Sequence, residues 1–101
     1  MSYSIIISAS AKQHLQDSFD WYQSQRLSLG HEFRQEFKVA INRLSTGVVD
    51  YQVYMGTIRK TSLHRFPYYV YYERDEIQHT IVILAVLHFK RNPNDIKNLL
   101  P

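Results

Sequence analysis

Four side chains in the second half of the chain have the types that metal-free phosphoryl chemistry requires: Arg59, Arg65, His88 and Arg91. An arginine is always charged and can hold a phosphate through two parallel hydrogen bonds, so Arg59 and Arg65 are candidate phosphate contacts. An imidazole titrates near neutral pH, so His88 is a candidate general acid or base, and Arg91 would add charge. These residue types are consistent with cleavage of RNA and also with recognition of an acidic partner.

The same residues also fit purely structural roles. Arg59 and Arg65 would then be solvated charges on strand edges, which discourage sheets from aggregating. His88 would be a strand-end residue that bonds to the backbone, and Lys90 and Arg91 would form a solvated strand exit.

Two helices are predicted after a short first strand. Residues 3–7 are β-branched and aromatic, which is typical of a strand. Ser10 and Gln13 fit a capping box, so a helix is expected from Ser10 to about Arg26. Residues 27–30 break it, and a second helix ends near Gly47. Its apolar face repeats every three or four residues: Phe33, Phe37, Ala40, Ile41 and Leu44.

A small sheet is predicted in the second half of the chain. Residues 48–56 have no clear period and are expected to be a loop. Strands are expected at 57–66, with a bulge or a short start, and at 68–73 and 77–89, with a turn at 74–76. Residues 95–100 are predicted to form a helical turn that docks Leu99 and Leu100 on the core. The expected class is α+β, in the order β-α-α-β-β-β, as one domain over residues 1–101.

The aromatic residues of the third predicted strand alternate between two faces. Tyr68, Val70 and Tyr72 should share one face, and Tyr69 and Tyr71 the other, because side chains alternate along a strand. Cross-strand aromatic pairs stabilise sheets, so we expect at least half of the tyrosines to build the fold.

Composition limits the chemistry further. The chain has 101 residues and no cysteine, and its five histidines show no metal-ligand spacing, so neither a metal nor a cofactor is predicted. No segment is typical of a signal peptide or a membrane span, and a cytoplasmic location is expected. The net charge of +3 arises entirely from residues 51–101. A local basic patch is therefore expected rather than long-range attraction to nucleic acid.

Several short motifs occur in this order of elements: Trp21-Tyr22 near the end of the first helix, Arg65-Phe66-Pro67-Tyr68, the apolar run 81–86, and His88 followed by Arg91-Asn92-Pro93. Together they resemble the RelE/ParE superfamily of toxins from type II toxin–antitoxin modules, and the ParE-like branch most. The resemblance covers nearly the whole chain.

The resemblance implies a fold and two alternative targets. The fold would be a small curved, mainly antiparallel sheet with a helical hairpin packed on one side, around which an antitoxin segment wraps. ParE-like members poison DNA gyrase and show no nuclease activity, whereas RelE-like members cut mRNA in the ribosomal A site.

Two departures from the nuclease pattern favour DNA gyrase as the target. Nucleases of the superfamily that use a strand-end histidine often carry tyrosine next, where this chain has Phe89. They also carry an arginine where this chain has Pro67-Tyr68. We therefore expect a ParE-like toxin that inhibits DNA gyrase by protein contact. The alternatives are a ribosome-dependent mRNA endonuclease that uses Arg59, Arg65, His88 and Arg91, and a degenerate toxin that only binds its antitoxin.

A cognate acidic antitoxin is the expected partner. It should cross the basic side of the sheet, and the residues expected to contact it or the target are Arg59, Arg65, Tyr68, His88, Lys90 and Arg91. Such a partner folds on binding, through strand addition or a helix in a groove. A homodimer or a heterotetramer with the antitoxin is the expected assembly.

Overall fold

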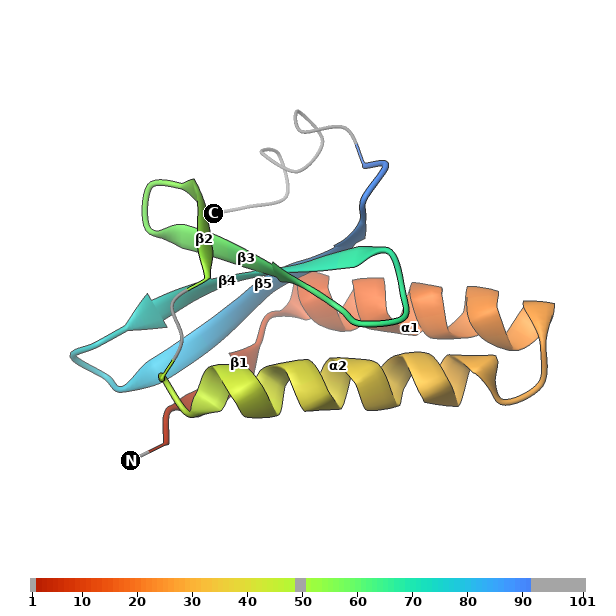
Figure 1. The fold of residues 1–101 in the computed structure, drawn as a ribbon, viewed down its shortest axis with the longest axis horizontal. Coiled ribbons are helices and arrows are strands. Elements are labelled where there is room, and N and C mark those ends of the chain that lie inside the picture. Colours follow the sequence, from red (N-terminus) through yellow and green to blue (C-terminus); the bar gives the residue numbers. More distant parts are fainter. Residues whose placement is uncertain (1, 49–50, 92–101) are drawn as a thin grey trace.

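Two antiparallel helices lie side by side on one face of a five-stranded sheet (Figure 1). The structure is a computed structural model that describes residues 2–48 and 51–91. No helix among these residues is long and apolar enough to cross a membrane. The predicted helical turn at 95–100, with Leu99 and Leu100, lies outside the described residues.

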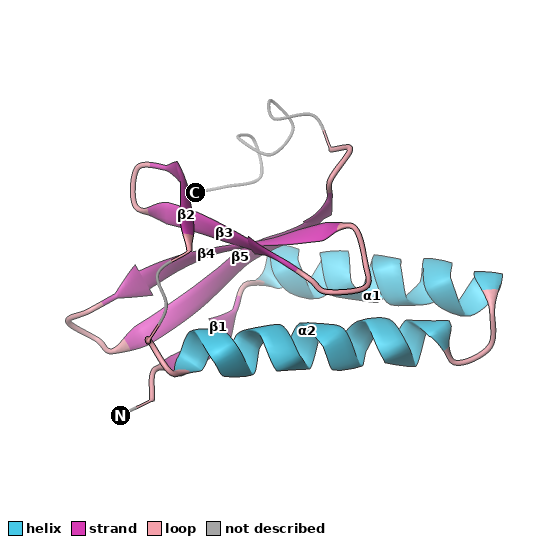
Figure 2. Cartoon of the chain, in the orientation of Figure 1, coloured by secondary structure: helices cyan, strands magenta, loops and turns pink. Residues whose placement is uncertain are grey.

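The helices and strands follow the predicted order with one addition. They are β1 (Ser4–Ile7), α1 (Ala9–Gln25), α2 (Leu29–Ser45), β2 (Gln52–Met55), β3 (Ile58–Ser62), β4 (Tyr68–Asp75) and β5 (Thr80–His88) (Figure 2). The strand order is β1-β5-β4-β3-β2, in which β1 runs parallel to β5 and the other pairs are antiparallel. The predicted α+β class, with a helical hairpin on a mainly antiparallel sheet, is confirmed.

Strand β2 is the addition, because residues 48–56 were expected to be a loop. It is mostly exposed and pairs with β3, so it carries little of the apolar alternation that marks a half-buried strand.

The bulge expected within residues 57–66 is absent from β3, which is shorter than predicted and pairs with β4 in continuous register. The irregularity lies instead in β2, between Val53 and Met55. A bulge was expected because Ile58 and Leu63 would point to opposite faces of one continuous strand. Leu63 lies beyond the end of β3, so both can be buried without a bulge.

Helix α1 begins earlier than the predicted capping box. Ser8 is the N-cap, and its Oγ accepts a hydrogen bond of 3.1 Å from the backbone N–H of Ala11. Ile7 is the last residue of β1 to pair with β5, so the chain turns into the helix directly after it. The cap assigned to Ser10 was therefore wrong by two residues.

Helix α2 packs on the sheet through the face that the sequence predicts. Its buried residues are Gly30, Phe33, Phe37, Ala40 and Leu44. The helix ends before Gly47, whose φ of 66° lies in the left-handed region that favours glycine. The predicted helix end is confirmed.

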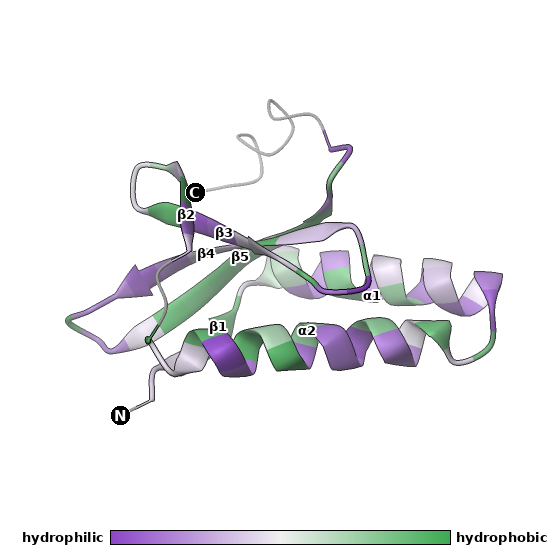
Figure 3. Ribbon diagram, in the orientation of Figure 1, coloured by the Kyte–Doolittle hydropathy of each residue, from purple (hydrophilic) through white to green (hydrophobic). Residues whose placement is uncertain are grey.

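The sheet buries apolar side chains on both of its faces, and β5 is the most apolar strand (Figure 3). Tyr68, Val70 and Tyr72 face the helices, and Tyr71 belongs to the cluster on the opposite face, with Tyr69 packed against it. The predicted alternation of the tyrosines is confirmed.

A register shift in β5 adds to the far cluster. Tyr71 pairs with Ala85 and Tyr72 with Ile83, so Leu84 is an extra residue between them. Both Leu84 and Ala85 therefore face away from the helices, in the second cluster. The β4–β5 turn also differs from the prediction, because β4 continues to Asp75 and β5 begins only at Thr80.

Candidate functional site

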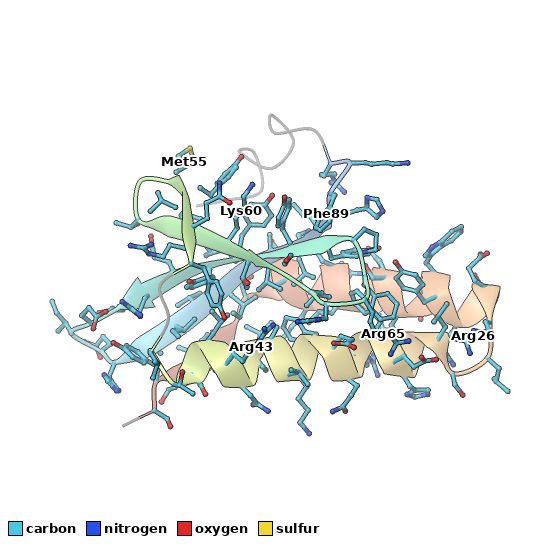
Figure 4. The ribbon with its side chains drawn as sticks, in the orientation of Figure 1. Arg26, Arg43, Met55, Lys60, Arg65 and Phe89 are labelled. Atoms are coloured by element: carbon cyan, nitrogen blue, oxygen red, sulfur yellow. The ribbon has the colours of Figure 1, made fainter. Side chains whose placement is uncertain are left out.

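The predicted site residues lie in three separate places, and each place has its own set of contacts. Arg65 lies on the loop between β3 and β4, above α2 (Figure 4). One guanidinium nitrogen is 2.6 Å from Glu32 and the other is 3.7 Å from Glu36. Glu32 also contacts Arg26 at 2.9 Å. The Arg65 guanidinium, as a hydrogen-bond donor, holds the pKa of Glu32 below its usual range, with Arg26 contributing further.

Arg59 is also engaged by the chain itself. Its Nη1 donates a hydrogen bond of 2.6 Å to the backbone carbonyl of Tyr51, immediately before β2. Because Arg59 pairs with Tyr72 across the β3–β4 ladder, it lies on the side of the sheet that faces the helices. The side chain therefore ties the start of β2 to β3.

The remaining predicted residues meet at the end of β5. A cavity of about 130 Å³ lies between α1 and this strand end. Its described lining includes Tyr68, His88 and Arg91, together with His14 and Asp17 from α1. Arg59 and Arg65 are not part of this lining. The four residues proposed for RNA cleavage are therefore not assembled around one cavity.

Two imidazoles line this cavity, and the backbone fixes the hydrogen-bonding state of each. Nδ1 of His14 accepts a hydrogen bond of 3.2 Å from the N–H of Val86, and Nδ1 of His88 accepts one of 3.0 Å from the N–H of Lys90. A nitrogen that accepts carries no proton, so a neutral ring in this arrangement donates from Nε2. Burial, followed by the charge of Arg91, lowers the pKa of His14. In its neutral form each ring therefore carries its proton on Nε2, and its Nδ1 lone pair is already engaged by the backbone.

Tyr68 is almost fully buried, at 8% exposure, and this limits its role in binding. Its ring packs edge-on against those of His88, at 5.3 Å between centroids, and Phe33, at 5.0 Å. The ring of Tyr22 also lies near it, at 6.1 Å between centroids. Tyr68 therefore supports His88 from the core, and its predicted contact with a partner stays a prediction. Lys90, also predicted there, is exposed beside it.

Two tyrosines give the fold a measurable pH dependence. Burial is the largest cause that raises the pKa of Tyr22 to about 12, with Tyr68 adding to it, and burial likewise raises the pKa of Tyr71 to about 12. An unfolded tyrosine titrates near pH 10. Between about pH 10 and 12 the folded state therefore holds protons that the unfolded state has lost, so the free energy of unfolding decreases as the pH rises.

We expect stability to be constant toward neutral pH with respect to these two groups and to decline above about pH 10. Urea denaturation at increasing pH measures this decline, and the absorbance of tyrosinate follows the ionisation itself. Replacement of Tyr71 by phenylalanine should make the decline shallower. A decline that is equally steep in this variant would contradict the assignment.

Sequence reasoning missed the acidic and imidazole partners on the helices. His14 lies one turn from buried Ala11 and Ser18, so its position beside the inner stripe of α1 was a usable signal. Glu32 and Glu36 occupy the α2 positions i and i+4, but nothing in the sequence indicates that Arg65 lies above them. Within the described part of the chain, no group of three or more metal-ligating side chains is present.

Comparison with known proteins places this arrangement in a family. The family model of the ParE toxin of type II toxin–antitoxin systems, parDE, matches residues 5–93. Among solved structures, a chain of the chromosomal ParDE TA system from P. aeruginosa superposes with a TM-score of 0.73 at 15% sequence identity. The match covers 86% of this chain and 96% of that one, so the two share a fold. Comparison with curated protein sequences gives no match. The chain therefore belongs to the ParE toxins of type II toxin–antitoxin systems.

Proposed function

We propose that this ParE-family toxin inhibits DNA gyrase by protein contact and that an acidic antitoxin neutralises it. One observation carries the proposal: the two arginines predicted to bind phosphate already have partners within the chain. Arg65 is held by two glutamates of α2, and Arg59 by the carbonyl of Tyr51. RNA cleavage requires cations that converge on one phosphate together with a base, and neither condition is supported by these contacts.

The strand-end histidine supports the same conclusion. Because Nδ1 of His88 accepts from a backbone N–H, the imidazole has no free lone pair with which to remove a proton from a ribose hydroxyl. The following residue, Phe89, has no hydroxyl and packs 4.4 Å from the ring of Tyr69. These contacts therefore argue against His88 as a general base and are compatible with a surface for protein contact.

Controlled expression in a bacterial host tests the proposal. We expect the wild-type chain to induce the SOS response and to trap gyrase on cleaved DNA, while mRNA stays intact in the ribosomal A site. His88→Ala should leave these effects nearly unchanged, whereas a nuclease that used His88 would lose on the order of 10²-fold in rate. Cleavage of mRNA without an SOS response would overturn the proposal.

Two further variants make the result interpretable. His88→Asn retains a side-chain acceptor for the N–H of Lys90, so it separates loss of the imidazole from loss of that hydrogen bond. His31→Ala is the matched control, because His31 is exposed on α2 and packs at 5.1 Å against Phe19, away from the strand end. Co-expression of a small acidic protein encoded beside this gene should restore growth, and failure to do so would count against the antitoxin part of the proposal.

A further inference from the structure

A second and larger hollow lies beside the C-terminal end of β3, and the charged side chains of its described lining are cationic. It has a volume of about 420 Å³, within the range of ligand-binding sites. The lining comes from the end of α2, the start of β2, and strands β3 and β4: Arg43, Tyr51, Gln52, Lys60, Thr61, Ser62, His64 and Tyr69. Among the described lining residues there is no carboxylate.

The cations of this cleft differ from three arginines of the fold that pair with glutamates. Arg65, Arg26 and Arg74 each contact a glutamate within the chain. Within residues 2–48 and 51–91, neither Arg43 nor Lys60 forms an ion pair. Among the described residues no carboxylate compensates these two charges, so a partner that approaches them meets positive potential.

Arg43 and Lys60 reach the cleft from opposite sides of the sheet edge. Arg43 comes from α2, on the face of the sheet that the helices cover, and Lys60 comes from β3 (Figure 4). The ammonium of Lys60 lies 4.2 Å from the ring centre of Tyr69 and 5.5 Å from that of Tyr54, in the cluster on the far face. A single carboxylate would reach only one of these two cations. An extended peptide segment that crosses the edge of the sheet matches better, because its side chains alternate and can present an acidic group to each side.

The aromatic residues argue against single-stranded nucleic acid as the occupant. Proteins that bind such strands without sequence preference stack bases on open aromatic faces. Here the ring of Tyr69 is covered by Lys60 and flanked by Phe89 at 4.4 Å and Tyr71 at 6.1 Å. The rings orient the ammonium and are not open platforms for bases. The cleft thus offers cations and hydroxyl donors, which suit carboxylates.

From these observations we propose that the cleft between the end of α2 and strands β2 and β3 binds an extended acidic peptide segment, held by Arg43 and Lys60. The inference rests on the proposed function in one respect, namely that the segment belongs to the antitoxin. Neutralisation would then depend on residues that lie apart from the cavity beside His88.

Fluorescence anisotropy on the purified full-length chain tests this proposal. The probe is a short fluorescein-labelled glutamate-rich peptide, with its glutamine counterpart and an oligothymidylate of equal length as comparisons. We expect the glutamate peptide to bind best and to weaken with added salt. The double variant Arg43→Glu/Lys60→Glu should lose about 10-fold or more in affinity, because two charge-assisted contacts become repulsive.

The matched control is Lys12→Glu/Lys38→Glu, which makes the same change of net charge on exposed positions of α1 and α2. It should bind the peptide nearly as the wild type does. Equal losses in the two double variants would show that net charge alone is responsible, and tighter binding of oligothymidylate would show a nucleic-acid site. Either outcome overturns the proposal. Thermal unfolding followed by circular dichroism confirms that each variant is folded.

The peptide assay is independent of gyrase, so the two proposals fail in different ways. If the wild-type chain binds the peptide through Arg43 and Lys60 but causes no SOS response, the proposed function fails and the cleft stands. If the SOS response occurs but charge reversal leaves peptide affinity unchanged, the cleft proposal fails alone.

Discussion

Replacement of Phe33 by alanine is expected to lower the free energy of unfolding by about 3–5 kcal/mol, the usual cost of removing a buried phenylalanine. Phe33 is fully buried at 0% exposure, on the face of α2 that meets the sheet. Its ring centre lies 5.0 Å from that of Tyr68, 5.3 Å from Phe66 and 5.4 Å from Tyr22. The substitution would open a cavity below three aromatic rings that cannot all close over it.

This loss is large relative to the total stability of a small domain, which is about 5–15 kcal/mol. Urea denaturation followed by circular dichroism measures it. Phe89→Ala is the matched control, because Phe89 is 46% exposed and the same truncation there should cost about 1 kcal/mol or less. Similar losses at the two positions would contradict the packing described for Phe33.

The consequence extends from the core to the surface. Phe66, which Phe33 supports, lies in the loop that also carries Arg65, and Arg65 reaches Glu32 one residue before Phe33 on α2. Phe33→Ala should therefore weaken the contact between this loop and α2 as well as the global fold.

Replacement of Gly47 by alanine is expected to cost roughly 2–4 kcal/mol, from two sources that add together. The φ of 66° at Gly47 disfavours any residue with a Cβ atom. An added Cβ would also lie 2.2 Å from the ring of Tyr3, so that ring must move. Tyr3 stacks on His79 at 4.0 Å and donates a hydrogen bond of 2.6 Å to Glu76, and both contacts would be disturbed.

Gly56 provides the control that separates the two sources. Its φ of 57° is similar, but no atom lies within 4 Å of an added Cβ. Gly56→Ala should therefore show the conformational cost alone, about 1–2 kcal/mol. The difference between the two variants in urea denaturation reports the crowding against Tyr3. No difference would mean that Tyr3 moves without loss and that its contacts with His79 and Glu76 contribute little.

The elements that sequence analysis predicted well are those whose apolar pattern faces a single core. The α2 face of Phe33, Phe37 and Leu44 and the alternation of Tyr68 to Tyr72 were both predicted, because burial on one side imposes the period of the helix or strand on the sequence. Strand β2 was not predicted, because it is held by backbone pairing with β3 rather than by burial of its own side chains.

The N-cap illustrates a second limit. Ser8 and Ser10 are both suitable capping residues, and local propensity does not distinguish them. The choice was made by the pairing of Ile7 with Ile83, which places the end of β1 immediately before Ser8. A contact between residues far apart in sequence thus set a local boundary.

The candidate site shows the same contrast between local sequence pattern and long-range contact. The sequence by itself determined the family, the helical hairpin on its sheet, and the set of basic residues that a partner can contact, because residue type and period are local properties. Only the tertiary structure decided which of these charges are engaged. Arg65 meets Glu32 and His14 meets Val86 across separations of 33 and 72 residues, whereas Arg43 and Lys60 meet no carboxylate among the described residues. Such pairings depend on how α1 and α2 cross the sheet, and a linear pattern of residue types does not encode that geometry.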